Sequence, residues 1–193
     1  DLNVTEDVLY KNLHQDCKYS IRKAHKNNLT IRETIDVNRF LDVFYEQFTD
    51  VFLKQNKHIV KSKAWYRNAV ATLYPQNMIL LEAVTTDNII VATGIILHSG
   101  HYAATWQTAS DRKYQHLRPN ELLRYEAMLE VKRRGATYIN FCGTQAYKDK
   151  FGAQLVYVPR LMWSRYSWII KVKQFSKRIY YTYRQLFTKI RKE

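Results

Sequence analysis

Residues 101–153 decide the fold, and they read HYAATWQTASDRKYQHLRPNELLRYEAMLEVKRRGATYINFCGTQAYKDKFGA. An apolar, β-branched run at residues 101–110 leads through a basic loop into residues 119–134, where apolar side chains recur at helical spacing. Residues 137–142 have the pattern of a strand, and residues 145–151 fit a short helix. A strand that enters a helix through a basic loop brings backbone N–H groups and a positive helix end together, which suits a phosphate-bearing cofactor.

Three apolar and β-branched runs form the centre of the chain, at residues 78–84, 89–98 and 101–110. They are separated by Thr86-Asp87-Asn88 and Ser99-Gly100, two sequences typical of tight turns. This pattern predicts an antiparallel meander of three strands.

Helical spacing of apolar residues predicts further helices around the meander. They fall within residues 1–28, from Asp36 or Asn38 through Phe52, over residues 62–74, and, as a basic amphipathic helix, over residues 167–192. Short strands are predicted at residues 29–32 and 155–163.

The expected fold class is therefore α/β (α+β), with a mixed central sheet that contains an antiparallel meander and is flanked by helices. We expect one domain over residues 1–165 and a basic amphipathic C-terminal helix over residues 166–193.

The composition indicates a globular chain with a basic surface. Its 193 residues, 46% of them hydrophobic, are enough for one compact domain. Lys and Arg total 31 against 17 Asp and Glu, and the net charge of +14 favours an acidic partner such as a nucleotide, a nucleic acid or an anionic membrane. The chain begins at Asp1 rather than Met, so we expect residues upstream of it in the intact protein.

The two cysteines, Cys17 and Cys142, lie in apolar patterns and form neither a CxxC motif nor a Cys/His cluster. We expect both to be buried, reduced thiols in a cytoplasmic protein, with no disulfide and no zinc site. The sequence shows no signal-peptide pattern, and no apolar run approaches the roughly 20 residues that span a bilayer.

Four short motifs occur in order along the chain. They are Ile21-Arg22-Lys23-Ala24, LRPNELL at residues 117–123, YINFCG at residues 138–143, and Lys150-Phe151-Gly152-Ala153. With the order of the predicted elements, they resemble the GNAT superfamily of N-acyltransferases, and most closely its FemAB-like (BioF2-like) branch. The chain departs from the pattern of that branch at Asn140, where Asp is usual, and at Cys142, where Gly is usual.

The resemblance implies an enzyme that transfers an acyl group to a primary amine. Acetyl-CoA or another acyl-CoA is the expected cofactor. Aminoacyl-tRNA is the alternative donor, because the pyrophosphate signature of ordinary GNAT enzymes is absent between Ser110 and Glu121, as is usual in the Fem branch. An amino sugar or a cell-envelope precursor, small or lipid-linked, is the expected acceptor.

The resemblance also implies a donor site. Backbone N–H groups near Thr108, Ala109 and Ser110 would hold the acyl carbonyl, and the alternative is an ordinary strand edge. Asn140 is assigned to the same cofactor site.

The phosphates of the donor would meet the start of the helix at Arg118 and Asn120, helped by Arg112 and Lys113. The alternative is a solvated basic loop that precedes an ordinary helix start.

Tyr147 lies where GNAT enzymes often place the general acid that protonates the leaving thiolate. A phenol suits this task, but in a chain with 15 tyrosines amphipathic packing is the alternative. Glu82 on the second strand and His101 at the start of the fourth are candidate bases, and Asp111 is a third. A water chain, or an amine that arrives deprotonated, would serve in place of a base.

Two other interpretations stay open. The basic surface would bind RNA or DNA without catalysis, or the departures at Asn140 and Cys142 would mark a degenerate acyltransferase fold used for assembly or membrane attachment. The C-terminal helix fits an anionic membrane, which would place the protein peripherally at the inner face of the cell membrane. It equally fits packing on the domain or on a second copy in a homodimer.

Overall fold

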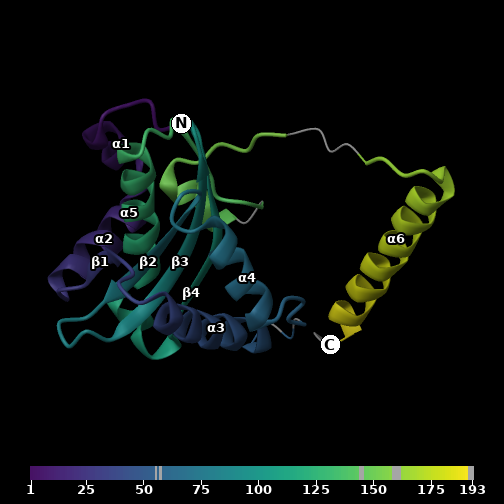
Figure 1. Ribbon diagram of the computed structural model, residues 1–193, viewed down its shortest axis with the longest axis horizontal. Coiled ribbons are helices and arrows are strands. Elements are labelled where there is room, and N and C mark those ends of the chain that lie inside the picture. The colour runs from purple at the N-terminus through teal and green to yellow at the C-terminus, as the bar shows by residue number, and fades with distance from the viewer. Residues whose placement is uncertain (55, 57, 144–145, 158–161, 191–193) are drawn as a thin grey trace. The chain divides into compact units, whose positions relative to one another are not determined.

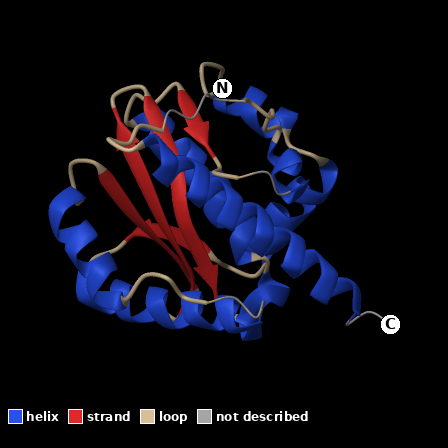
Figure 2. Cartoon of the chain, turned by 90° about the vertical axis from the view of Figure 1, so that its right-hand side faces the viewer, coloured by secondary structure: helices blue, strands red, loops and turns tan. Residues whose placement is uncertain are grey.

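The computed structural model of the chain describes residues 1–193 except 55, 57, 144–145, 158–161 and 191–193. The chain divides into two compact units, Asp1–Gln154 and Leu155–Glu193, which we describe separately. The first unit contains one five-stranded sheet with helices on both of its faces (Figure 2). The predicted fold class, a mixed α/β sheet flanked by helices, is confirmed.

The sheet has its strands in chain order. They are β1 (Thr30–Glu33), β2 (Met78–Val84), β3 (Ile90–Ser99), β4 (Tyr102–Ser110) and β5 (Tyr138–Asn140). The strands β1 to β4 pair antiparallel, as the predicted meander requires, and β5 pairs parallel to β4.

Two irregularities shape β4. The register passes from Ile95 opposite Gln107 to Ile96 opposite Thr105, so Trp106 is an extra residue that bulges from the ladder. On the other side, the pairing with β5 ends where Ala104 lies opposite Asn140. From Thr105 to Ser110, the outer edge of β4 therefore has no strand partner among the described residues.

Eight helical segments surround the sheet or follow it in the described chain. They are α1 (Glu6–Asn12), α2 (Gln15–Lys26), α3 (Val37–Lys54), α4 (Lys63–Leu73), the 3-10 helix η1 (Arg112–Leu117), α5 (Pro119–Arg133), the 3-10 helix η2 (Ala146–Phe151) and α6 (Ser167–Ile190). Of the two proposed caps of α3, Asp36 fills the role, because its Oδ1 accepts from the backbone N–H of Arg39 over 3.0 Å. Gly135, with φ of +88°, ends α5 as predicted.

Residues 1–28 form two helices rather than the single one predicted. After α1, Leu13 is extended with φ −66° and ψ 142°. His14 then caps α2, because its Nδ1 accepts from the backbone N–H of Asp16 over 3.3 Å. The backbone N–H of His14 donates to the carbonyl of Lys150 over 2.9 Å. This long-range hydrogen bond fixes the break, and no local periodicity encodes it.

The two faces of the sheet carry separate hydrophobic cores. Helices α2 and α5 cover one face (Figure 1), where the buried residues include Cys17, Ile21, Ile79, Leu81, Ile96, Leu122 and Leu123. Helices α3 and α4 cover the other with Phe40, Phe44, Phe48, Tyr66, Met78, Leu80 and Ile95. Gly94 lets α5 approach the sheet, because a Cβ at that position would lie only 3.2 Å from the Leu123 side chain.

The strand predicted at residues 155–163 is wrong for the part that the structure describes. Residues 155–157 and 162–163 have no regular secondary structure, and residues 158–161 lie outside the described residues. An apolar, β-branched run becomes a strand only when a neighbouring strand offers its backbone groups, and the sequence pattern does not reveal whether one does.

The predicted C-terminal helix is present as α6, and residues 191–192 of that prediction lie outside the described residues. Trp168, Val172, Phe175 and Ile179 recur along it at intervals of three or four residues and are exposed. None of the described helices combines the length and the apolar character that a membrane span requires.

Candidate functional site

Polar side chains gather beside the unpaired edge of β4, on the face covered by α5. The Arg124 guanidinium lies between two hydroxyl groups: its Nη2 donates to Thr108 Oγ1 over 2.6 Å and to the Tyr147 hydroxyl over 3.1 Å. Asn120 Nδ2 donates to Ser110 Oγ over 3.0 Å. We call these five residues, Thr108, Ser110, Asn120, Arg124 and Tyr147, the β4 edge site.

Helix α5 supplies the two donors of this site from one side. Asn120 and Arg124 are four residues apart, which places both on the same stripe of the helix. The rest of the helix face that meets the sheet is apolar, with Leu122, Leu123 and Ala127 buried. The sequence motif predicts Asn120 but not Arg124, although the two form a polar pair at helical spacing in a helix with a largely buried face.

Tyr147 is held by charge as well as by its hydrogen bond. The Arg124 guanidinium lies 5.1 Å from the ring centroid and Lys148 Nζ lies 5.7 Å from it. The Tyr147 side chain is still 44% exposed. Because Arg124 donates to the phenol oxygen, the phenolic hydrogen can be donated to another group.

Arg124 has donor capacity left over. Its Nε atom is buried and has no hydrogen-bond partner among the described residues. A buried unpaired donor on a cation is costly, so a ligand acceptor at this place would be stabilised by it.

Asn140 builds a turn at the point where β4 and β5 separate. Its Oδ1 accepts from the backbone N–H of Cys142 over 2.7 Å, and Cys142 takes a positive φ of 51°. Lys148 closes the same turn by donating to the carbonyls of Cys142 and Gly143. Burial, and then the nearby Arg124 charge, lower the pKa of Lys148 below its usual value. The expectation that Cys142 is buried is wrong: its thiol is exposed, whereas that of Cys17 is buried.

The start of α5 lacks a side-chain cap. Arg118, the residue before the helix, has left-handed backbone angles (φ 63°, ψ 43°) and makes no capping hydrogen bond, and Pro119 follows at the first helical position. The N-cap residue therefore offers no side-chain acceptor to the backbone N–H groups of the first turn. Arg118 and Lys113 are exposed, while Arg112 forms an ion pair with Asp50.

The remaining donor-site residue, Ala109, turns its side chain to the other face, where it is buried against α3 and α4. The backbone N–H of Asp111 donates to the carbonyl of Val91 on β3 over 3.0 Å. Because N–H directions alternate in an antiparallel ladder, the N–H of Ala109 also points to β3, while those of Thr108 and Ser110 point to the open edge.

Glu82 also lies on the α3 side of the sheet. Glu82, Thr93 and Ala109 are neighbours across three strands, and Thr93 Oγ1 donates to Gln47 of α3 over 2.9 Å. Because side chains alternate along a strand, Thr108 and the other residues of the β4 edge site lie on the opposite face. The structure thus does not bring Glu82 to Tyr147.

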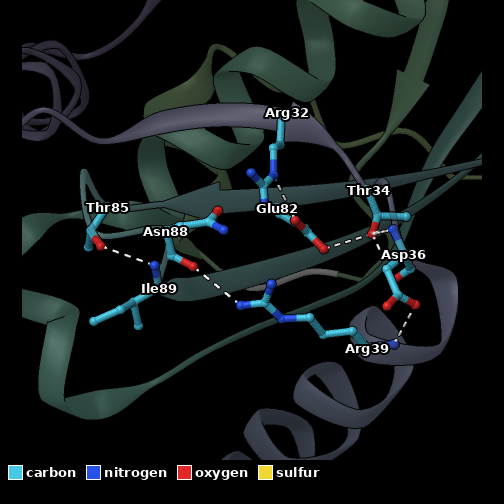
Figure 3. A network of polar contacts seen from close by, with 8 residues as sticks. All are labelled: Arg32, Thr34, Asp36, Arg39, Glu82, Thr85, Asn88 and Ile89. Carbon is cyan, nitrogen blue, oxygen red and sulfur yellow. Dashed lines mark hydrogen bonds and ion pairs between the residues drawn. The ribbon is translucent and has the colours of Figure 1, made fainter.

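The Glu82 carboxylate, only 2% exposed, is bound within a polar network (Figure 3). Arg32 Nε donates to one oxygen over 2.9 Å, and the Thr34 hydroxyl donates to the other over 2.7 Å. Figure 3 also shows Asp36, Arg39 and Asn88 extending the network along the same side of the sheet.

His101 is exposed in the turn between β3 and β4, and its carbonyl accepts from the backbone N–H groups of Thr137 and Tyr138. Seven residues of extended chain separate it from Thr108, on the order of 20 Å. Asp111 caps η1, with its Oδ1 accepting from the backbone N–H of Lys113 over 2.9 Å. Within the described part of the chain, no hydrogen bond or ion pair joins either residue to Tyr147 or Arg124.

A separate open pocket of about 550 Å³ lies near the turn between β2 and β3. Its lining residues are His25, Asn28, Leu29, Thr30, Arg32, Val84, Thr85, Thr86 and Asn88. No residue of the β4 edge site lines this pocket.

The chain matches a known protein family. A family model described as acetyltransferase (GNAT) domain matches residues 11–149, which include β1 to β5, α5 and the five residues of the β4 edge site. No curated protein matches the chain.

Solved structures share the fold at low sequence identity. FemX matches with a TM-score of 0.67 and 13% identity, over 74% of this chain and 51% of its own. An aminoglycoside acetyltransferase from an uncultured soil metagenomic sample matches with a TM-score of 0.50 and 17% identity, over 71% of this chain and 98% of its own. A transcriptional regulator from Bacillus halodurans C-125 matches with a TM-score of 0.54 and 14% identity, over 70% and 99%.

These likenesses establish a shared fold and no more, because all three identities are far below 25%. The chain spans about half the length of FemX.

Proposed function

Because the chain belongs to the GNAT acetyltransferase domain family, we propose that its β4 edge site transfers an acyl group from a thioester or ester donor to a primary amine. The observation that carries this proposal is the Arg124 guanidinium, which holds the Tyr147 hydroxyl and the Thr108 hydroxyl together at the unpaired edge of β4. A family member needs a proton donor near the acyl group, and Tyr147 is the residue with that chemistry there.

The transfer requires three events at this edge. The neutral amine nitrogen attacks the acyl carbonyl carbon, and the backbone N–H groups of Thr108 and Ser110, at the open edge, stabilise the oxygen that becomes negative. The C–N bond forms, the bond from carbon to the leaving sulfur breaks, and the Tyr147 phenol gives its proton to that sulfur. Solvent then restores the phenol proton and takes the proton lost by the nitrogen.

Coenzyme A, when bound, supplies the activated thioester. The uncapped first turn of α5 and the exposed Arg118 would hold its phosphates, since helix N-termini favour anions. The unpaired Arg124 Nε is a further donor for an acceptor atom of the donor molecule. Asn140 contributes indirectly, by ordering the turn from which Lys148 and Tyr147 follow.

Two donors are compatible with this arrangement. We favour acetyl-CoA or another acyl-CoA, and aminoacyl-tRNA is the alternative that the resemblance to the FemAB-like branch implies. The net charge of +14 suits either polyanion. For the acceptor we propose an amino sugar or a cell-envelope precursor, a class to which the aminoglycoside of the soil metagenomic acetyltransferase is chemically related.

Helix α6 supports a peripheral position at a membrane. Its 24 residues include six Lys or Arg and no Asp or Glu, while Trp168, Val172 and Phe175 form an apolar stripe. Such a helix favours the interface of an anionic bilayer. We therefore propose that the protein associates peripherally with the inner face of the cell membrane. Lipid-linked amines would then be accessible as acceptors. The alternative is that the same apolar stripe forms a homodimer.

Calorimetric titration of the full chain with acetyl-CoA and with free CoA, at low and at moderate salt, tests the proposal. We expect saturable binding that survives moderate salt, and, on addition of an amino sugar, a product heavier by one acetyl group in mass spectrometry. Binding of RNA that collapses as salt rises, with no CoA binding, would instead indicate a basic nucleic-acid-binding module.

A further inference from the structure

An aromatic pair holds an ammonium group on the α3 and α4 side of β4. The rings of Trp65, from α4, and Trp106, the bulge residue of β4, have centroids 5.3 Å apart and planes inclined by 56°. Lys61 Nζ lies 3.2 Å from the Trp65 centroid and 5.6 Å from the Trp106 centroid. The two indoles thus form a cation-binding corner that the chain's own lysine occupies.

The corner is built on rigid elements. Both indoles pack against Tyr66, which is 1% exposed, with centroid distances of 5.2 Å for Trp65 and 5.7 Å for Trp106. The Tyr45 hydroxyl donates to the carbonyl of Lys61 over 3.4 Å and so positions the segment that carries the lysine. Trp65 is nevertheless 39% exposed, so one ring of the corner is accessible from solvent.

Lys61 is held by these rings rather than by an acid. No carboxylate among the described residues lies within ion-pair distance of it, whereas Lys63, two residues later, pairs with Asp42 Oδ1 over 2.6 Å. A lysine at a surface rich in water can detach from two indoles at a modest cost, since cation–π contacts at exposed sites are weak. An incoming ammonium group can take its place.

The corner borders the β4 edge site across the strand. Trp106 is two residues from Thr108, and the outer edge of β4 is unpaired from Thr105 onward. No described strand therefore closes this edge between the Trp106 face and the Arg124 face.

We propose that Trp65 and Trp106 bind an ammonium group of the acceptor other than the neutral amine that attacks the acyl carbonyl, and that Lys61 occupies this subsite until the acceptor displaces it. The inference rests on the proposed acyl transfer and narrows its acceptor to a molecule with a second, cationic amine. A subsite of this kind selects the charged group of an amino sugar over the neutral sugar ring, because the indole faces attract the cation electrostatically.

Calorimetry with three sugars of matched ring structure tests the selection. Glucosamine is titrated at a pH where its amine is protonated, beside N-acetylglucosamine and glucose, which are neutral. We expect saturable binding of glucosamine alone, weakened roughly 3- to 30-fold by Trp65→Leu. Equal binding of all three sugars, or glucosamine binding that Trp65→Leu leaves unchanged, would overturn the proposal.

Two lysine variants test the displacement. Lys61→Met removes the resident ammonium, and Lys63→Met removes the same charge two residues away. We expect Lys61→Met to tighten glucosamine binding several-fold and Lys63→Met to leave it nearly unchanged. An absence of saturable glucosamine binding to the Lys61→Met variant, or equal effects of the two substitutions, would overturn it.

A CoA titration of the same samples separates this inference from the acyltransferase proposal. CoA binding without selective glucosamine binding would contradict the proposed aromatic subsite and would leave the proposed acyl transfer standing. Selective glucosamine binding without CoA binding keeps the subsite and removes CoA as the donor.

Discussion

Arg124 donates to the hydroxyl of Tyr147 over 3.1 Å while its guanidinium lies 5.1 Å from the centre of the same ring. The two residues come from α5 and η2, 23 positions apart in the chain. One cation thus fixes both the place of the phenol oxygen and the direction in which its hydrogen can be donated. This contact distinguishes Tyr147 from a tyrosine that is merely exposed at the surface.

Tyr147→Phe removes the phenol and keeps the ring. We expect the kcat of acyl transfer to fall about 100-fold, in the range of a lost general acid, with KM for the donor changed less than about threefold. Steady-state kinetics with free-thiol detection measures both. Tyr138→Phe, which removes an exposed phenol from β5 where it stacks on Tyr102, is the matched control. Unchanged turnover of Tyr147→Phe would take this residue out of the mechanism.

Arg124→Met removes the cation that positions Tyr147 and Thr108. We expect kcat to fall about 10- to 100-fold, because the phenol loses its fixed orientation. Donor affinity should also weaken, because the spare Nε is lost. Arg124→Lys should recover little, since one ammonium does not reproduce the guanidinium fork. Full activity of the Met variant in the same assay would show that the contact is structural only.

Arg32→Met leaves the nearly buried Glu82 carboxylate with the Thr34 hydroxyl as its remaining hydrogen-bond partner among the described residues. We expect the free energy of unfolding to fall by about 2–3 kcal/mol, less than for a fully buried pair because Arg32 is 29% exposed. Urea denaturation with an unchanged m-value measures this loss. Arg39→Met, on an exposed contact in the same network, should cost about 0.5 kcal/mol or less. Equal losses for the two variants would contradict the buried network.

The two thiols should differ in reactivity. Burial raises the pKa of Cys17 from 9.0 to about 11, whereas Cys142 is exposed. Since the thiolate is the nucleophile, alkylation of the folded chain at pH 8 should modify Cys142 quickly and Cys17 slowly. Peptide mass spectrometry after timed alkylation identifies each product.

The raised pKa of Cys17 also makes the free energy of unfolding depend on pH. The folded value lies above the unfolded one, so the folded state binds more protons between pH 9 and about pH 11. The contribution of Cys17 to stability is therefore complete below pH 9 and is lost as the pH rises toward about 11. Urea midpoints of the parent chain and of Cys17→Ala should converge over that interval; parallel curves would contradict the shift.

Phe175→Glu places a charge in the apolar stripe of α6. We expect co-sedimentation of the chain with vesicles of phosphatidylglycerol and phosphatidylcholine to fall at least about fivefold. Gln174→Glu changes the net charge equally on a residue outside the stripe and should reduce binding far less. Equal losses for both variants would point to charge alone, and binding that neither variant affects would remove α6 as the membrane contact.

Much of the fold was predictable because it rests on local patterns. The β2–β3–β4 meander follows from apolar runs separated by turn residues, and α5 follows from Pro119, a helical period and Gly135. The motif at residues 117–123 and its companions pointed to the GNAT family, and the family model matches residues 11–149. Each of these features depends on residues that lie close together in the sequence.

Two of the wrong secondary-structure predictions concern segments whose structure depends on residues distant in the sequence. His14 breaks the N-terminal helix through a hydrogen bond to Lys150. The exposure of Cys142 has a local origin instead, because Asn140, two residues earlier, folds the chain into a turn. Residues 155–157 resemble a strand but have none beside them among the described residues.

Periodicity and motifs are properties of neighbouring residues, and they are sufficient to predict the type of the principal elements and the family. The assignment of Tyr147, Ser110 and Asn120 to the site stays a prediction. Which side chains meet depends on the tertiary structure. The bulge at Trp106 and the early end of the β4–β5 ladder set the faces and the open edge, so that Arg124 joins Tyr147 while Glu82 lies across the sheet. Strand register and helix packing are relations between distant segments, and no single stretch of chain contains them.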